Sequence, residues 1–200
     1  GQNVVDSIVK FDTIFKVDII KIGRDAKNFK ASKEFSSFYN TYKKELDEKQ
    51  ERIQKIIDET FAKFEKNIGN AKILPSGLKI AILETKNGEK PKVGQNVKVN
   101  YAGYFTNGKL FDTSYKDVAI AYETFDKERD NQNGYAPFST ICGPDARLIA
   151  GFKEGLQELK VGDRALLFIP SHLGYGVQGA GSVIPPNTDL VFEIELVEIE

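Results

Sequence analysis

The sequence has few of the residues on which metal, disulfide or nucleophilic chemistry depends. Its 200 residues include one cysteine and one histidine, and neither methionine nor tryptophan. The single Cys142 excludes an internal disulfide, and its neighbours Ile141 and Gly143 favour a buried small side chain over a nucleophile. His172 has no companion at metal-ligand spacing, which favours a surface position. We therefore expect neither a metal ion nor another cofactor.

Several other function classes lack their sequence signals. There is no G-x-S-x-G motif, and the glycines of GYGVQGAG (174–181) follow neither a Walker nor a dinucleotide-binding spacing. The 28 basic and 29 acidic residues nearly balance, at a net charge of −1, so a nucleic-acid partner is not expected. No apolar run approaches the roughly 20 residues of a membrane span. The pattern is that of a soluble protein, of the cytoplasm or the periplasm.

The native beginning of the protein is expected to lie upstream of Gly1. The chain does not begin with methionine, and it contains none. A missing beginning means that no secretion signal could be seen here, so the sequence leaves the compartment open.

The most informative stretch is VKVNYAGYFTNGKLFDTS (97–114). Its first nine residues alternate between two sets, which is the period of a strand with one buried face. Asn107-Gly108 then predicts a two-residue hairpin turn with two positive φ angles. Asp112 follows Phe111 directly, and an unpaired carboxylate in such an apolar setting would cost several kcal/mol. We therefore expect Asp112 to be hydrogen-bonded and to belong to a site.

Four motifs follow one another along the chain, namely YAGYFTNGKLFDTS (101–114), GFKEGLQELKVGDRALLFIP (151–170), LGYG (173–176) and GSVIPPNTDLVFEIELVEIE (181–200). In this order they resemble the FKBP family of macrolide-binding peptidyl-prolyl cis-trans isomerases. The resemblance covers about residues 73–200. It implies an α+β domain in which an antiparallel sheet curls around a short helix, here expected to begin near Gly143-Pro144-Asp145. The expected domain spans 73–200, after a helical N-terminal region at 1–72.

The resemblance also implies a site, transferred here residue by residue. Asp112 would orient the pocket through hydrogen bonds and polarise the bound amide, Tyr175 would donate to a substrate carbonyl, and Ile149 would offer a backbone N–H. Phe152 would form the floor. The catalytic set is Tyr101, Phe111, Asp112, Tyr175 and Phe192, and the substrate-binding set is Phe138, Leu148, Ile149, Phe152, Val183 and Ile184.

The chain departs from the family pattern in several places. Phe152 stands where many members have tryptophan, which predicts a wider pocket and weaker macrolide binding. Ala180 and Gly181 predict a looser flap, and Ala150 replaces a charged side chain often found there. Residues 113–136 form a long polar insertion. The insertion is expected to be a surface loop, with the alternative that it flanks the site and contacts substrate.

Residues 32–68 predict one long helix with Ser32 as its N-cap and Gly69-Asn70 as its stop signal. Apolar residues recur at spacings of three and four, and the helix would extend about 55 Å. One interpretation is a dimerisation or client-binding arm, since an uncovered apolar stripe of this size usually marks an interface. The other is a tether whose ends pack on the neighbouring segments while DEKQER (47–52) stays in solvent.

The first 24 residues predict a short amphipathic helix followed by a β-like run. This pattern resembles the closing helix and strand of a cyclophilin-type domain, in which case the chain would be the trailing part of a longer protein. The alternative is an N-terminal extension that packs on the long helix. A terminal helix and strand alone could not form a cyclophilin barrel or its active site.

Two functions from different classes follow from these observations. The first is a peptidyl-prolyl cis-trans isomerase that acts on proline-containing protein segments through a desolvated aromatic pocket. The second is a non-catalytic chaperone or dimeric client-binding module that grips its clients with the long helix. The presence of Tyr101, Phe111, Asp112 and Tyr175 together favours catalysis.

Overall fold

A computed structural model describes residues 20, 22–28 and 30–200. Within this part of the chain, α2 (Arg24–Asn28) and α3 (Ala31–Ile68) precede an antiparallel sheet. α3 has 38 residues and begins one residue before the predicted Ser32. Most of the segment predicted to resemble a cyclophilin terminus lies outside the described residues. That resemblance stays a prediction.

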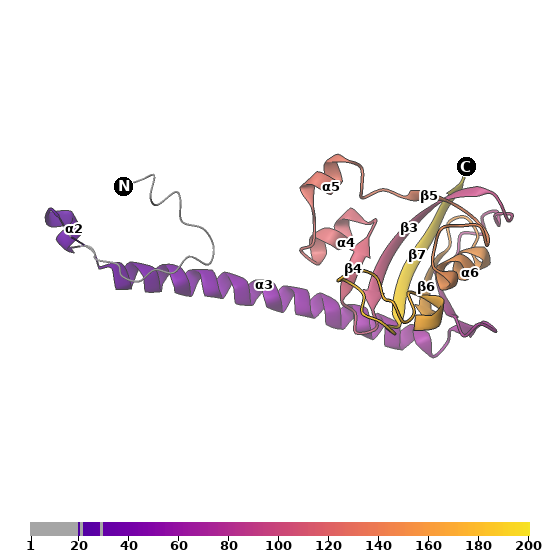
Figure 1. Cartoon of the computed structure of the whole chain (residues 1–200), viewed down its shortest axis with the longest axis horizontal. Helices are drawn as coiled ribbons and strands as arrows, with labels where there is room; N and C mark the ends of the chain where they lie inside the picture. Colours follow the sequence, from indigo (N-terminus) through magenta and orange to yellow (C-terminus); the bar gives the residue numbers. More distant parts are fainter. Residues whose placement is uncertain (1–19, 21, 29) are drawn as a thin grey trace. The chain divides into compact units, whose positions relative to one another are not determined.

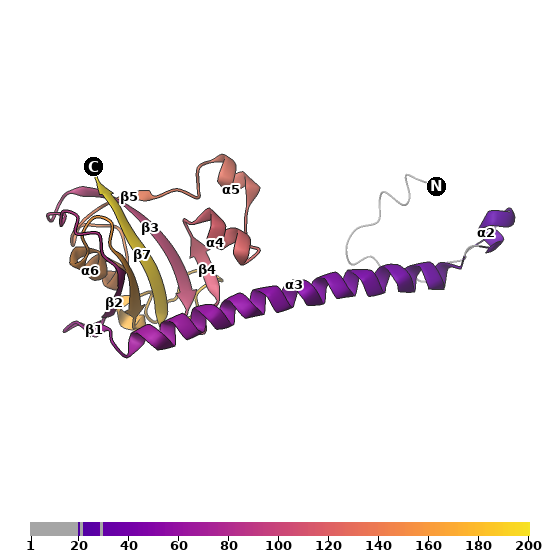
Figure 2. The ribbon, with the colours of Figure 1, turned by 180° about the vertical axis from the view of Figure 1, so that it is seen from behind.

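The sheet has seven described strands, in the order β1-β2-β6-β7-β3-β4, and β5 also pairs with β3. The long strands β3 and β7 run side by side (Figure 1), and β1 and β2 lie at one edge (Figure 2). The strand bounds are β1 (Lys72–Ile73), β2 (Lys79–Glu84), β3 (Asn96–Phe105), β4 (Leu110–Thr113), β5 (Phe138–Ile141), β6 (Arg164–Ile169) and β7 (Leu190–Ile199). The remaining helices are α4 (Lys116–Ala121), α5 (Lys127–Asn131), α6 (Ala150–Glu158) and the short 3₁₀ helix η1 (Ser171–Leu173). The expected long helix, antiparallel sheet and short helix are confirmed.

Alternate residues of the strands build two separate apolar clusters on the two faces of the sheet. We call the first the α6 face, because α6 packs on it through Phe152 and Leu156. We call the second the α3 face, because Phe64 of α3 packs there against Tyr104 and Phe168, with ring centroids 5.5 and 6.2 Å apart. In β6, for example, Leu167 belongs to the first cluster and Leu166 to the second.

The hairpin between β3 and β4 differs from the predicted two-residue turn. Gly108 has a φ of +84°, whereas Asn107 is absent from the described residues with positive φ. The Gly108 N–H donates to Phe105 O at 3.0 Å, and the Phe105 N–H donates to Lys109 O at 2.9 Å. This is the pattern of a three-residue loop in which a left-handed residue follows a type I turn. A Cβ on Gly108 would lie 2.4 Å from the Ile57 carbonyl oxygen of α3, so only glycine fits there.

Two further expectations are corrected. α6 begins at Ala150 and not near residues 143–145, because Ile149 has an extended conformation with ψ 150° and serves as the N-cap. The insertion at 113–136 is not simply a loop, since it contains α4 and α5. Cys142 is buried, as its apolar neighbours predicted.

The chain divides into two compact units, at 1–46 and 47–200, so the boundary falls within α3. In the first unit, Phe35 and Phe38 are 68 % and 69 % exposed, and each stacks on the tyrosine four residues later in α3. In the second unit, the rest of α3 covers the α3 face of the sheet. None of the helices in the described ranges is long and apolar enough to cross a membrane. The domain bounds inferred from the sequence stay a prediction.

Candidate active site

A cavity of about 590 Å³ opens beside the α6 face of the sheet. All five residues predicted to be catalytic line it, together with four of the six predicted to bind substrate. The lining residues are Tyr101, Phe111, Asp112, Ser114, Arg129, Gly134, Ala136, Phe138, Arg147, Leu148, Ile149, Phe152, Tyr175 and Phe192.

Val183 and Ile184 are not among the lining residues. Ile184 is 4 % exposed and packs in the core cluster of the α6 face, whereas Val183 is 55 % exposed. A bridge between Ala180 and Ile184 closes this segment on itself. The placement of Ile184 in the core gives it a packing role in this structure.

Aromatic rings form the walls and the floor of the cavity. Phe192 packs edge to face against both Phe111 and Phe152, with ring centroids 5.5 and 5.4 Å apart. Tyr101 packs in the same manner on Phe138, at 5.5 Å. Gly103 makes room for this wall, because a Cβ at that position would lie 2.5 Å from the Phe111 ring. The closely packed rings produce a surface with little capacity to hydrogen-bond water.

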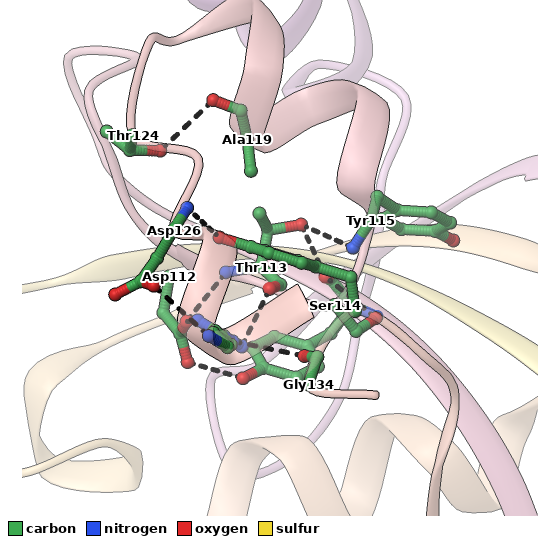
Figure 3. Close-up of polar contacts among 11 residues, drawn as sticks. Asp112, Thr113, Ser114, Tyr115, Ala119, Thr124, Asp126 and Gly134 are labelled. Carbon is green, nitrogen blue, oxygen red and sulfur yellow. Dashed lines mark hydrogen bonds and ion pairs between the residues drawn. The ribbon is translucent and has the colours of Figure 1, made fainter. Parts of the chain in front are cut away.

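Asp112 places a charge beside the aromatic wall. Both of its carboxylate oxygens accept hydrogen bonds, as the sequence predicted. It accepts a hydrogen bond from the Tyr101 hydroxyl and, at 2.9 Å, from the Thr113 backbone N–H. The Arg129 guanidinium donates to the Asp112 carboxylate at 2.7 Å. Figure 3 shows these contacts around Asp112, Thr113 and Gly134. The carboxylate therefore points along the cavity wall in a fixed direction.

Comparisons with known proteins identify the family of the chain. A family model for FKBP-type peptidyl-prolyl cis-trans isomerases matches residues 87–197. The chain belongs to this family. It is therefore an FKBP-type peptidyl-prolyl cis-trans isomerase.

Two sequence relatives and one solved structure illustrate the match. FK506-binding protein 1 of Dictyostelium discoideum is 40 % identical over 121 residues, which are 60 % of this chain and 96 % of that protein. A probable FKBP-type peptidyl-prolyl cis-trans isomerase of Haemophilus influenzae is 29 % identical over 209 residues, covering 99 % of this chain and 78 % of its own length. The crystal structure of FkpA from Escherichia coli aligns with a TM-score of 0.52 and 30 % identity, covering 85 % of this chain and 71 % of that one.

Arg129 is one of five cavity residues that sequence reasoning missed, and the others are Ser114, Gly134, Ala136 and Arg147. Arg129 lies on α5, inside the insertion, and besides Asp112 it donates to the carbonyl oxygens of Thr113 and Gly134 at 2.9 and 3.0 Å. Its guanidinium also lies over the Tyr135 ring, 4.8 Å from the centroid. One signal was available, because Asp126 is a typical N-cap residue and here it caps α5. The insertion therefore flanks the cavity in this FKBP-type chain, which is the first part of the alternative interpretation, and its contact with substrate stays a prediction.

The electrostatic setting keeps the two cavity tyrosines protonated. Burial, followed by the hydrogen bond and the charge of Asp112, raises the pKa of the Tyr101 hydroxyl. Burial and the Asp112 charge also raise the pKa of Tyr175. Both phenols therefore keep their protons and can donate hydrogen bonds throughout the neutral pH range. Tyr175 is 37 % exposed at the cavity, which leaves its hydroxyl accessible.

The N-terminal end of α6 lies at the cavity. No side chain caps this end at Ile149, and Ile149 itself lines the cavity. The first N–H groups of a helix have no partner within the helix. Within the described ranges, no cluster of three or more His, Cys, Asp or Glu residues could hold a metal ion. The polar groups at this site are therefore hydroxyls, one ion pair, one further cation and backbone N–H groups.

Proposed function

We propose that the aromatic cavity binds the proline of a flexible protein segment and accelerates rotation about the preceding amide by removing it from water. The barrier to this rotation is about 18–20 kcal/mol, because resonance holds the amide planar. Twisting the amide ends the resonance and reduces the charge separation between oxygen and nitrogen. A dry site disfavours the polar planar form more than the twisted form, and so lowers the barrier by differential binding. The packed rings of Phe111, Phe152 and Phe192 support this role.

Polar groups at the rim would hold the substrate while the amide turns. The Tyr175 hydroxyl and the Ile149 N–H would donate to carbonyl oxygens of the bound chain, which the presence of both residues in the cavity lining supports. Asp112 would polarise the amide from the wall, and Arg129 is a positioning residue that holds the carboxylate in place. This division of roles needs no covalent intermediate, in keeping with a cavity that offers no activated nucleophile. The physiological role would be to speed slow Xaa-Pro steps during protein folding.

The aromatic wall around Phe111 is the single observation that carries this proposal. Removing the Phe111 ring tests it. Uncatalysed exchange takes tens to hundreds of seconds, so NMR exchange spectroscopy on a short Leu-Pro peptide detects modest catalysis. Phe111→Ala should lower the catalysed rate by at least about tenfold, which equals about 1.4 kcal/mol of transition-state stabilisation. Phe61→Ala removes the same ring from a position on α3 that is 43 % exposed, and should leave the rate unchanged.

Two results would contradict the mechanism. One is no acceleration by the folded wild-type chain, and the other is full activity in a folded Phe111→Ala variant. Circular dichroism and peptide binding on the same samples would separate lost folding from lost catalysis. If the peptide binds without acceleration, the scaffold serves for binding alone.

The exposed aromatic residues of α3 support a second role, as a dimerisation or client-binding arm. Phe35 and Phe38 are more than two-thirds exposed, and Tyr39 and Tyr42 are each 50 % exposed. An exposed apolar patch of this kind usually marks an interface. Our proposed occupant is a second copy of the chain, which gives a homodimer at tens of micromolar protein. The alternative occupant is an unfolded client.

Light scattering across that concentration range tests the dimer. Wild type should show twice the 22.4 kDa of one chain, and Phe35→Ser/Phe38→Ser should show a single mass. Lys43→Ser/Lys44→Ser changes polar positions of α3 and serves as the control. A monomeric wild type would remove the dimer. Loss of client refolding in the phenylalanine variant, with peptide isomerisation intact, would favour the client-binding role.

Macrolide binding is a further proposal for the same cavity. FK506-binding protein 1 of Dictyostelium discoideum shares 40 % identity with this chain over 121 residues. Phe152 forms the buried floor here, with 3 % exposure, and lines the cavity. A phenyl floor offers less contact area than an indole would, so FK506 should bind weakly and compete with the peptide.

A further inference from the structure

Arg147 is a charged residue at the cavity that the isomerase chemistry does not use. Its side chain is exposed and lines the cavity, immediately before Leu148 and Ile149. Within the described residues it has neither an ion pair nor a hydrogen bond. The two other charged lining residues, Asp112 and Arg129, neutralise each other across 2.7 Å. The cavity therefore presents one uncompensated positive charge.

The backbone on either side of Arg147 is firmly held. Ala146 is 7 % exposed, and its N–H donates to Gly143 O at 3.3 Å. Lys153 of α6 donates to Pro144 O at 3.0 Å. On the other side, Ile149 is the N-cap of α6. A loop anchored at both ends places the guanidinium at the cavity without help from a partner side chain.

We propose that Arg147 determines sequence specificity by pairing with an acidic side chain of the substrate, close to the Xaa-Pro bond. The inference rests on the proposed isomerase function, because it concerns the chain that occupies the same cavity. A guanidinium binds a carboxylate through two parallel N–H···O bonds, so arginine recognises Asp or Glu with defined geometry. Acidic groups of the protein itself do not compete within the described residues, since nearby Asp145 is not a lining residue and Asp112 is already paired.

The expected effect is modest, because exposed ion pairs are worth little and are screened by salt. A well-placed Glu should raise kcat/KM about two- to fivefold over Gln at low ionic strength. Most of that difference should vanish at about 1 M salt, where the screening length falls to about 3 Å. An acidic residue cannot enter the aromatic floor itself. The preference therefore applies to positions that flank the Leu-Pro pair.

The test uses peptides with one Leu-Pro pair and with Glu, Gln or Lys at each position one or two residues away. NMR exchange gives kcat/KM for each peptide, and chemical-shift titration gives its affinity. The full chain is compared with Arg147→Gln and Arg147→Glu. Lys127→Gln removes an exposed cation of the insertion that does not line the cavity, and it serves as the matched control.

Wild type and Lys127→Gln should prefer Glu over Gln at one or more positions. Arg147→Gln should lose that preference, and Arg147→Glu should prefer Lys. Equal rates and affinities for Glu and Gln peptides in wild type would overturn the inference. A Glu preference that persists in Arg147→Gln would also overturn it.

The two proposals fail in different ways. If wild type accelerates no peptide, the isomerase mechanism fails, and the affinity ratios alone decide whether Arg147 selects acidic chains. If the Gln peptide is accelerated and Glu adds nothing, only the specificity inference fails.

Discussion

The two faces of the sheet use the same strands for different purposes. On the α6 face, Phe111, Phe192 and their neighbours leave a cavity of about 590 Å³. On the α3 face, Phe64 fills the space between the helix and the strands and is only 3 % exposed. The α3 face also holds Glu193, 4 % exposed, whose carboxylate oxygens lie 2.7 Å from Lys63 Nζ and 2.5 Å from an Arg164 nitrogen. One face holds an open cavity whose aromatic lining carries Asp112, Arg129 and Arg147, and the other is closed and contains an ion cluster.

The same strands can therefore contribute to stability through one face and to the proposed function through the other. Because neighbouring residues of a strand point to opposite faces, Val191 packs in the cluster of the α3 face and Phe192 in that of the α6 face, where it also lines the cavity. On the closed face, β3, β6 and β7 pack against α3 in one apolar cluster. Substitutions on the α3 face should therefore lower the free energy of unfolding and leave the catalysed rate unchanged, whereas substitutions in the cavity of the α6 face should lower the catalysed rate.

The largest effect is expected from Phe64→Ala on the α3 face. The variant removes a ring packed edge to face on Tyr104 and Phe168. It should lower the free energy of unfolding by about 3–5 kcal/mol, from lost burial and the cavity left behind. Urea unfolding measures the loss, and NMR exchange on a Leu-Pro peptide should give an unchanged rate per folded molecule. A folded variant with a lowered rate would show that the two faces are coupled.

A smaller loss of stability is expected from Glu193→Gln. The substitution keeps the shape but removes the charge that Lys63 and Arg164 share. Both cations are more than one-third exposed at the side chain, so water can replace part of the lost interaction. We expect a loss of about 1–3 kcal/mol, the usual cost of leaving buried polar groups poorly paired. Glu198→Gln, at an exposed ion pair with Lys98, should change the unfolding free energy by less than about 1 kcal/mol. Equal losses of unfolding free energy in the two variants would contradict a stabilising role of the buried ion cluster.

The closed face was harder to predict from the sequence than the open one. The long helix was predicted to within one residue, because an apolar stripe is a local signal that continues over many turns. Most cavity residues followed from ordered motifs. The sequence did not indicate which half of α3 covers the sheet, since Phe35 and Phe64 belong to the same stripe and differ only in their tertiary contacts.

Long-range contacts explain the other differences. Arg129 reaches Asp112 from 17 residues away, across an insertion whose polar composition resembles a loop. Asn107-Gly108 suits both a two-residue turn and a three-residue loop, and here the carbonyl of Ile57 lies against Gly108. Ile149 looks helical by its spacing from Phe152, yet its backbone is extended next to the cavity. In the insertion and in the hairpin, the local structure that formed is accompanied by a contact from elsewhere in the chain.

The smallest effect is a loss of stability at high pH that involves both faces. Burial raises the pKa of Tyr101 on the α6 face and of Tyr104 on the α3 face. Around Tyr104, the charges of Glu193 and Asp117 and the neighbouring Tyr122 raise the pKa further, whereas Arg164 opposes them. Since an unfolded tyrosine titrates near about 10, the folded chain binds more protons than the unfolded chain above that pH. The stabilisation is therefore fully present below about pH 10 and is lost as pH rises through the folded pKa values.

Urea unfolding between about pH 8 and 11 measures this loss, starting from the ordinary tyrosine pKa. Tyr104→Phe should flatten part of the decline, because it removes a buried phenol from the closed face. Tyr42→Phe removes a phenol that is 50 % exposed and should leave the decline as in wild type. If Tyr104→Phe and wild type lose stability equally, the decline originates elsewhere, and Tyr101 at the open face becomes the next residue to change. Tyr101→Phe would also remove the hydrogen bond to Asp112. This variant should therefore show both a lower catalysed rate and a smaller loss of stability at high pH.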